Sequence, residues 1–108
     1  MTKLLSIEKF IEQNNKLVTK KLKKYVEREY KEKYKEKLKK ESKLSESKIM
    51  RKAMQATIDF KKTPDFLKLI KSVPMDIVKE QMQIPYQEYC RETKLIIERE
   101  RMSAAVVT

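Results

Sequence analysis

Lysine side chains crowd one stretch of this sequence. Between Lys16 and Lys43 there are 13 basic and 5 acidic residues, a net charge of +8 over 28 positions. A lysine ammonium is a mobile point charge that pairs with any exposed phosphate oxygen, whereas reading of bases relies more on arginine. We therefore expect this stretch to contact nucleic-acid backbone without sequence preference. The expected phosphate ligands are Lys20, Lys21, Lys23, Lys24, Arg28, Lys31, Lys35, Lys39 and Lys40.

The net charge of +11 comes from one part of the chain. Residues 1–62 hold 20 basic and 9 acidic residues, while residues 63–108 hold 7 of each. Lysine outnumbers arginine by 22 to 5, as in proteins from AT-rich genomes, but such a bias would act along the whole chain. The asymmetry favours a partner of opposite sign, of which nucleic acid is the commonest. A solvated helical face with interspersed acids is the alternative interpretation.

Three tyrosines lie within the basic stretch. The rings of Tyr25, Tyr30 and Tyr34 can stack on unpaired bases. Tyrosines at helical spacing also pack against neighbouring helices and keep the hydroxyl group in water. Both interpretations stay open at this point.

Helices must position these side chains, because the composition favours no other element. The chain has no glycine, which tight hairpins and phosphate-binding loops require, and it is rich in helix-forming residues. Ser6 is a good N-cap, Glu8 suits a first helical turn, and no proline follows until Pro64. We predict an all-α protein that begins with one long basic helix, or two collinear helices, over residues 6 to about 43. A compact body of three to four shorter helices should follow.

The apolar residues of this first helix change their spacing along the chain. The residues Ile7, Ile11, Val18 and Leu22 fall on one stripe, which predicts a seam with another helix or another subunit. From Leu22 the apolar positions recur strictly every four residues to Leu38, a row that drifts by about 40° at each step. Such drift is typical of a helix that crosses a second helix obliquely, or of an arm that leaves the core.

A single domain accommodates the 108 residues. We divide it into a basic helical arm, residues 1–44, and a helical body, residues 45–108, with the serine-rich segment 41–48 as the joint. One body helix should begin near Ile49. Because proline is favoured at the first helical position, Pro64, Pro74 and Pro85 predict further helices at about 64–72, 74–83 and 85–102. The uncharged tail at 103–108 should pack on a neighbouring subunit.

Residues 78–92 have part of a helix-turn-helix pattern. Such a unit needs apolar groups at four positions that are here occupied by Val78, Met82, Ile84 and Tyr89, but Lys79 occupies a position that is usually small. Gln83 stands where the turn usually has glycine. The balanced charge of the segment also disfavours a recognition helix.

Several chemistries lack the residues that they need. The chain has no histidine and a single cysteine, Cys90, so it cannot form a Ser-His-Asp or Cys-His nucleophile, a cysteine-based zinc site or an intrachain disulfide. We expect no enzymatic activity, no catalytic or metal-binding residues and no cofactor. The sequence has no apolar run long enough for a signal peptide or a membrane span. It also lacks the tryptophan and apolar clusters of a membrane-surface helix. An intracellular setting fits best, in the cytoplasm, a nucleoid or a virion.

The function predicted from these observations is a non-enzymatic nucleic-acid-binding accessory protein that forms homo-oligomers. Its small size and lysine-rich composition fit a virus or a mobile element. A second hypothesis is a protein interaction module, such as an inhibitor, adaptor or virion component, whose basic helix docks on an acidic protein surface. A third is a structural helical oligomer in which the charges have no binding role.

Overall fold

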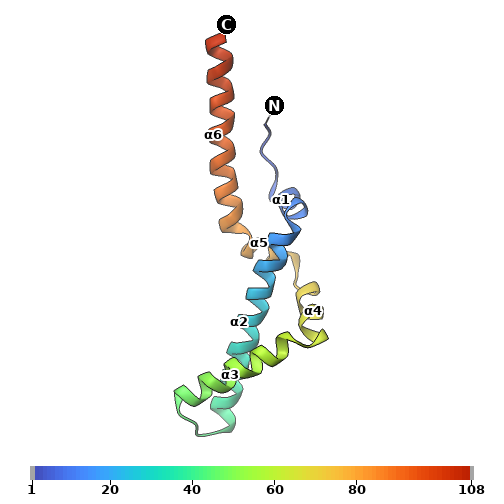
Figure 1. Ribbon diagram of the computed structural model, residues 1–108, viewed down its shortest axis with the longest axis vertical. Coiled ribbons are helices and arrows are strands. Elements are labelled where there is room, and N and C mark those ends of the chain that lie inside the picture. Colours follow the sequence, from blue (N-terminus) through green and yellow to red (C-terminus); the bar gives the residue numbers. More distant parts are fainter. Residues whose placement is uncertain (1, 108) are drawn as a thin grey trace. The chain divides into compact units, whose positions relative to one another are not determined.

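The chain folds into α-helices. The computed structural model describes residues 2–107, with side chains as far as Ala104, and within that range it contains six helices and no strand (Figure 1). The prediction of an all-α protein is confirmed. The tail predicted to contact another subunit lies mostly outside the described side chains. The helices are α1 (Ile7–Gln13), α2 (Asn15–Glu41), α3 (Glu46–Lys61), α4 (Pro64–Lys71), α5 (Met75–Gln81) and α6 (Gln83–Val107).

The long basic helix expected over residues 6–43 is not confirmed, because the helix breaks at Asn14. Ser6 is the N-cap of α1, as predicted, and its Oγ accepts a hydrogen bond from the backbone N–H of Lys9. Asn14 has φ −122° and ψ 44°, outside the helical region. Its side-chain amide donates to the carbonyl of Phe10 at 2.7 Å, so the asparagine takes over a backbone acceptor and ends α1.

Two of the three proline signals in the second half mark helix starts. Pro64 is the first residue of α4, with Thr63 at the N-cap position, and α5 begins directly after Pro74. In contrast, α6 begins at Gln83 and has Pro85 in its first turn, where a missing N–H removes no helical hydrogen bond. Helix α6 has 25 residues, so it begins two residues before and ends five residues after the predicted range 85–102.

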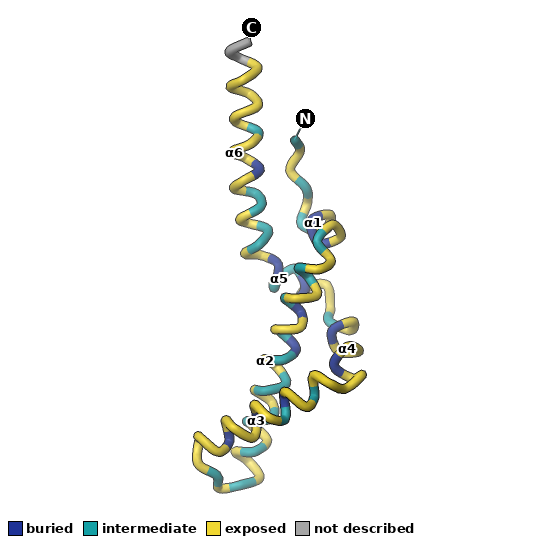
Figure 2. Tube along the Cα trace, in the orientation of Figure 1, coloured by how far each residue is buried: buried dark blue, intermediate teal, exposed yellow. Residues whose placement is uncertain are grey.

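The chain divides into two compact units. The first unit combines residues 1–18 with residues 75–108, and the second unit is the continuous segment 19–74. The predicted arm, residues 1–44, therefore contributes to both units. Each unit has its own small set of buried side chains, visible as dark blue positions along the trace in Figure 2.

Aromatic side chains hold the second unit together. The ring of Tyr30 in α2 stacks on that of Phe60 in α3, with centroids 4.1 Å apart and planes 2° from parallel. Phe60 also meets Phe66 of α4 edge-on at 5.9 Å. The Nζ of Lys61 lies 3.3 Å from a carboxylate oxygen of Glu27, which adds an ion pair between α3 and α2. Tyr30, a member of the four-residue row of α2, therefore packs against α3. The buried residues of this unit are Leu22, Val26, Ile49, Ala53, Thr57, Phe66 and Ile70.

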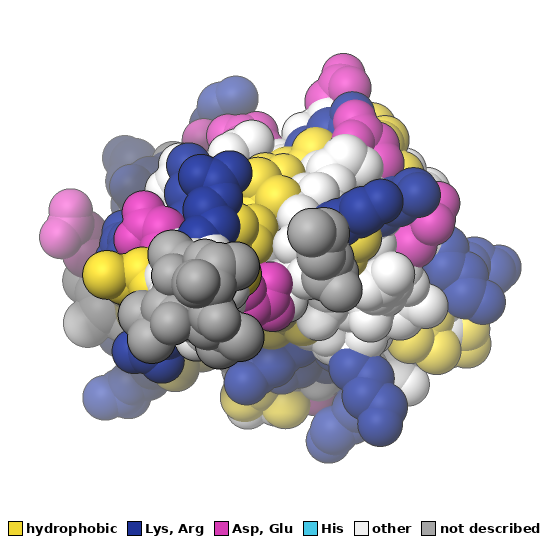
Figure 3. Space-filling view, turned by 90° about the horizontal axis from the view of Figure 1, so that it is seen from above, with side chains coloured by type: hydrophobic (Ala, Val, Ile, Leu, Met, Phe, Trp, Pro, Cys, Tyr) yellow, Lys and Arg dark blue, Asp and Glu magenta, His cyan; other side chains and the backbone are white. Residues whose placement is uncertain are grey.

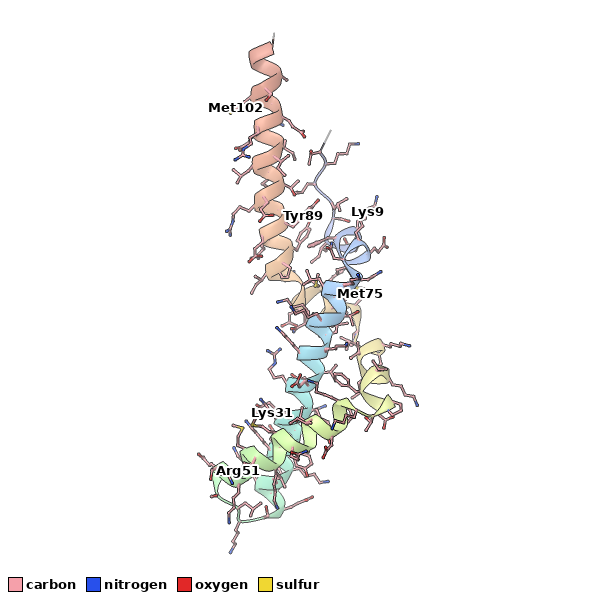
Figure 4. All side chains as sticks on the ribbon, in the orientation of Figure 1. Lys9, Lys31, Arg51, Met75, Tyr89 and Met102 are labelled. Atoms are coloured by element: carbon pink, nitrogen blue, oxygen red, sulfur yellow. The ribbon has the colours of Figure 1, made fainter. Side chains whose placement is uncertain are left out.

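In the first unit, the N-terminal segment is fastened to α6. The backbone N–H of Leu5 donates to the hydroxyl of Tyr89 at 3.0 Å, and the hydroxyl of Tyr86 donates to the carbonyl of Leu5 at 2.7 Å. Figure 4 shows Tyr89 on α6 beside this segment. The ring of Phe10 packs on both tyrosines, with centroids 5.5 and 4.9 Å away. Partial burial raises the pKa of Tyr86, which keeps its hydroxyl protonated as a donor.

Two carboxylates add to this arrangement. Glu8 of α1 forms an ion pair with Lys79 of α5 at 3.0 Å, and the hydrogen bond from Lys79 lowers the pKa of Glu8. Glu100 accepts hydrogen bonds from the side chain and backbone of Thr2, which lower the pKa of Glu100. Because α1 packs against α5 and α5 against α6, the first unit joins the two sequence-distant parts of the chain.

Candidate nucleic-acid interface

Seven of the nine predicted phosphate ligands share one face of α2. No carboxylate of this helix lies within that face, although Glu27 and Glu32 border it on either side. Lys23 and Lys40 lie on other sides of the helix and are separated from the shared face. At 3.6 residues per turn, the following side chains fall within an arc of about 100°: Lys20, Lys21, Lys24, Arg28, Lys31, Lys35 and Lys39.

Six of these side chains form two rows with a four-residue spacing. The first cationic row is Lys20, Lys24 and Arg28. The second cationic row is Lys31, Lys35 and Lys39. Each member of the second row follows its counterpart in the first by eleven residues, or about three helical turns, so the rows lie one behind the other along α2. This repeat is apparent in the helical geometry of α2 but not in the linear distribution of charge along the sequence.

The two cationic rows differ in solvent exposure. All three residues of the first row are exposed, whereas Lys31 and Lys35 of the second row are half-buried. The Nζ of Lys35 lies 3.5 Å from the carboxylate of Glu32. Within the described part of the chain, the other predicted ligands form no ion pair. Figure 3 shows, for one face of the molecule, Lys and Arg side chains standing out from the surface. The first row therefore has charge available for a partner.

Helix α3 adds further positive charge to the second unit. Lys48, Arg51 and Lys52 are all exposed on its outer side. Figure 4 labels Arg51 on α3 and Lys31 on α2, the two helices that carry these cations. Neither Lys48 nor Arg51 was among the predicted ligands, because the charge count was centred on the stretch that ends at Lys43.

The tyrosines of α2 are used in packing. One ring face of Tyr30 is occupied by Phe60, and Tyr34 stacks on Tyr30 with centroids 6.2 Å apart. Tyr25 is half-buried. Stacking of bases on Tyr30 would require that the Tyr30–Phe60 contact opens.

The predicted seam residues do not lie in one unit. Ile11 is buried and Ile7 and Val18 are half-buried in the first unit, whereas Leu22 is buried in the second. Their burial within the chain accounts for the apolar stripe without a second subunit. A role of these residues in oligomerisation stays a prediction.

Residues 78–92 do not form a spaced helix-turn-helix. Met82 alone separates α5 from α6, whereas the motif needs a turn of three to four residues. Val78 and Met82 are buried, as the pattern requires, but Ile84 is 68% exposed. The apolar spacing reflects packing of α5.

The described side chains contain no group of three or more His, Cys, Asp or Glu residues that could hold a metal ion. Cys90 is a half-buried free thiol on α6, close enough to Tyr86 to help raise the pKa of that tyrosine. Within residues 2–107, no helix is long and apolar enough to cross a membrane.

Comparisons of the chain with protein-family models, with curated protein sequences and with solved structures found no match. The arrangement of charge and apolar surface in the structure is therefore the basis for a proposed function.

Proposed function

We propose that the chain is a non-enzymatic nucleic-acid-binding accessory protein that contacts phosphates through α2 without reading sequence. The observation that supports this proposal is the acid-free face of α2 with its seven cationic side chains. Lysine and arginine on one helical face raise the local positive potential, and phosphates are the anions that such a face attracts most strongly.

The length of the face matches a short stretch of nucleic acid. Lys20 and Lys39 are 19 residues apart, which is about 28 Å along a helix. One turn of duplex DNA is about 34 Å long. A single α2 helix therefore reaches phosphates within less than one duplex turn, or several nucleotides of a single strand.

The exposed side chains of this face set the expected salt dependence. Lys20, Lys24, Arg28 and Lys39 are exposed, and four phosphate contacts give a slope of about −3.6 for log affinity against log salt on duplex DNA. Affinity should then fall about 10²-fold between roughly 50 and 200 mM salt. With so few contacts, we expect dissociation constants in the micromolar range typical of non-specific binding.

The test compares two triple variants of α2 by fluorescence anisotropy with random-sequence duplex DNA, single-stranded DNA and RNA. One variant replaces the first cationic row, Lys20→Gln, Lys24→Gln and Arg28→Gln. The matched control, Lys33→Gln, Lys37→Gln and Lys40→Gln, removes the same charge from exposed positions on other sides of the same helix. Glutamine has a helix propensity close to that of lysine, so both variants should remain helical by circular dichroism.

The two variants should behave differently. Loss of the first cationic row should reduce the salt slope by about 2.7 and weaken binding to all sequences alike, whereas the control should keep most of the wild-type slope. Equal losses in both variants would show that only net charge matters and would contradict the role of the face. Absence of binding by the wild type at low salt would refute the proposal as a whole.

The proposal places the protein where nucleic acid is present, inside a cell or a virion. Self-association is part of it, and exposed apolar residues of α6 support that part. Leu95 is 52% exposed and Met102 69%, on a helix whose other side holds the N-terminal segment.

A further inference from the structure

Helix α3 carries an apolar row that the fold leaves exposed. Met50, Met54 and Ile58 follow at intervals of four residues, and their side chains are 41%, 51% and 47% exposed. They share one side of α3, next to the buried residues Ile49 and Ala53. Single exposed apolar residues are normal on a protein surface, but three in register over about 12 Å form a continuous stripe.

A hollow opens at the N-terminal end of this stripe. It has a volume of about 220 Å³ and is lined by Lys35 and Lys39 of α2 and by Glu46, Ile49 and Met50 of α3. An apolar cavity of about 150 Å³ accepts a benzene molecule. By size, the hollow can take one leucine or aromatic side chain against Ile49 and Met50, with the Lys35 and Lys39 side chains among its other walls.

Positive charge surrounds the stripe. Lys35 and Lys39 stand on its α2 side, and Arg51 and Lys48 follow it on the outer side of α3. Glu46 is the one carboxylate that lines the hollow. The other acid in the middle and end of α3, Asp59, accepts a hydrogen bond from Gln55 at 3.1 Å. A ligand for this surface must bring apolar groups flanked by negative charge.

We propose that the stripe Met50–Met54–Ile58 and its hollow bind an acidic amphipathic helix of a partner protein. The apolar face of such a helix presents anchors at intervals of three and four residues, which match the spacing of the stripe, and its Asp and Glu residues face Lys35, Lys39 and Arg51. Methionine suits such a surface because its flexible, polarisable side chain adapts to different anchors.

The positive charge around the stripe determines which kind of molecule can bind it. A second copy of this chain would bring the same positive rim against itself, and like charges placed together oppose association. The binding surface shares Lys35 and Lys39 with the cationic face of α2, but it does not include the first cationic row, so Lys20, Lys24 and Arg28 can be changed without altering it.

The test uses the full chain and two fluorescein-labelled peptides of identical composition. One peptide is an acidic amphipathic helix with leucines on one face, and the other is a scrambled sequence that has the same charge but no apolar face. The binding variant is Met54→Gln with Ile58→Gln, and the control is Lys20→Gln, Lys24→Gln and Arg28→Gln. All positions are exposed, so the fold should be retained and is checked by circular dichroism.

The amphipathic peptide should bind the wild type at least tenfold more tightly than the scrambled peptide. The Met54 and Ile58 variant should lose at least tenfold in affinity for it while nucleic-acid binding changes less than twofold, and the Lys20 variant should show the reverse. Equal binding of both peptides would reduce the effect to charge attraction and overturn the proposal. Two other outcomes would overturn the proposal if the amphipathic peptide is not preferred. Binding to vesicles of anionic lipid that depends on Met54 would indicate a membrane ligand, and self-association that depends on Met54 would indicate a second copy of the chain.

Discussion

The stacked pair Tyr30–Phe60 should make a measurable contribution to the stability of the second unit. The perturbation is Tyr30→Leu and Phe60→Leu, singly and together, which keeps apolar volume while it removes the rings. With a centroid separation of 4.1 Å and planes 2° from parallel, the rings are offset by about 2 Å if their planes lie ~3.5 Å apart. Offset stacking of this kind is worth about 0.5–1.5 kcal/mol beyond area burial.

The expected magnitudes follow from the contacts of each ring. Tyr30→Leu removes the stack with Phe60 and the more distant contact with Tyr34, so it should destabilise by about 1 kcal/mol. Phe60→Leu removes the stack and the edge contact with Phe66, so it should destabilise by about 1.5–2 kcal/mol. The double variant should be more stable than the sum of the single changes predicts, with a coupling energy of about 1 kcal/mol.

Urea denaturation followed by circular dichroism provides the assay. For a unit of this size, each 1 kcal/mol also lowers the melting temperature by roughly 4–8 °C. Tyr25→Leu combined with Phe60→Leu is the matched control, because Tyr25 is a half-buried tyrosine of the same helix without a described ring contact to Phe60. If the Tyr30–Phe60 coupling is no larger than that of the control, the stack does not hold α2 to α3 and the reasoning is refuted.

Two further predictions concern the first unit. The hydrogen bond from Lys79 lowers the pKa of Glu8 below its ordinary value of 4.5. The stability that this contact adds is therefore present above about pH 4.5 and is lost as the pH falls through the lowered pKa. Glu8→Gln should reduce the acid-induced drop in the urea midpoint, and a pH profile identical to that of the wild type would contradict this prediction. If the exposed side chains of α6 mediate self-association, the double variant Leu95→Glu with Met102→Glu should be monomeric in sedimentation equilibrium. A wild-type protein that is itself monomeric would contradict the self-association part of the proposed function.

Sequence reasoning succeeded where a local signal decides the structure. Thr63 followed by Pro64 predicted the start of α4, because proline is favoured at the first helical position, where its missing N–H has no partner, whatever the helix packs against. The break at Asn14 was missed, although Asn14 and Asn15 are adjacent. The pattern of Ile7, Ile11 and Val18 continues through both asparagines, and only the hydrogen bond from Asn14 to Phe10 ends the helix.

The candidate site was predictable in its residue types but not in its surroundings. A helical projection of the sequence already places Lys20 and Lys31 on the same face and Lys40 on another. The half-burial of Lys35 depends on residues of α3, such as Ile49 and Met50, that lie beside it, and α3 also contacts α2 through Phe60 and Tyr30. Long-range contacts of this kind leave no periodic signal in the sequence. The exposure of Met50 and Met54 was also unpredictable, because their spacing with Ile49 and Ala53 is typical of a helix that is buried along one side.

The division into units gives the order in which the chain can fold during its synthesis. The second unit, residues 19–74, is continuous, so its internal contacts need no residue of the segment that follows it. The first unit needs residues 75–108, and its hydrogen bonds join positions 81 to 98 apart in sequence. At ribosomal rates of about 5–20 residues per second, translation of those 34 residues takes roughly 2–7 s. Until Tyr86 and Tyr89 have been added, Phe10, which is buried in the finished protein, lacks the two rings on which it packs.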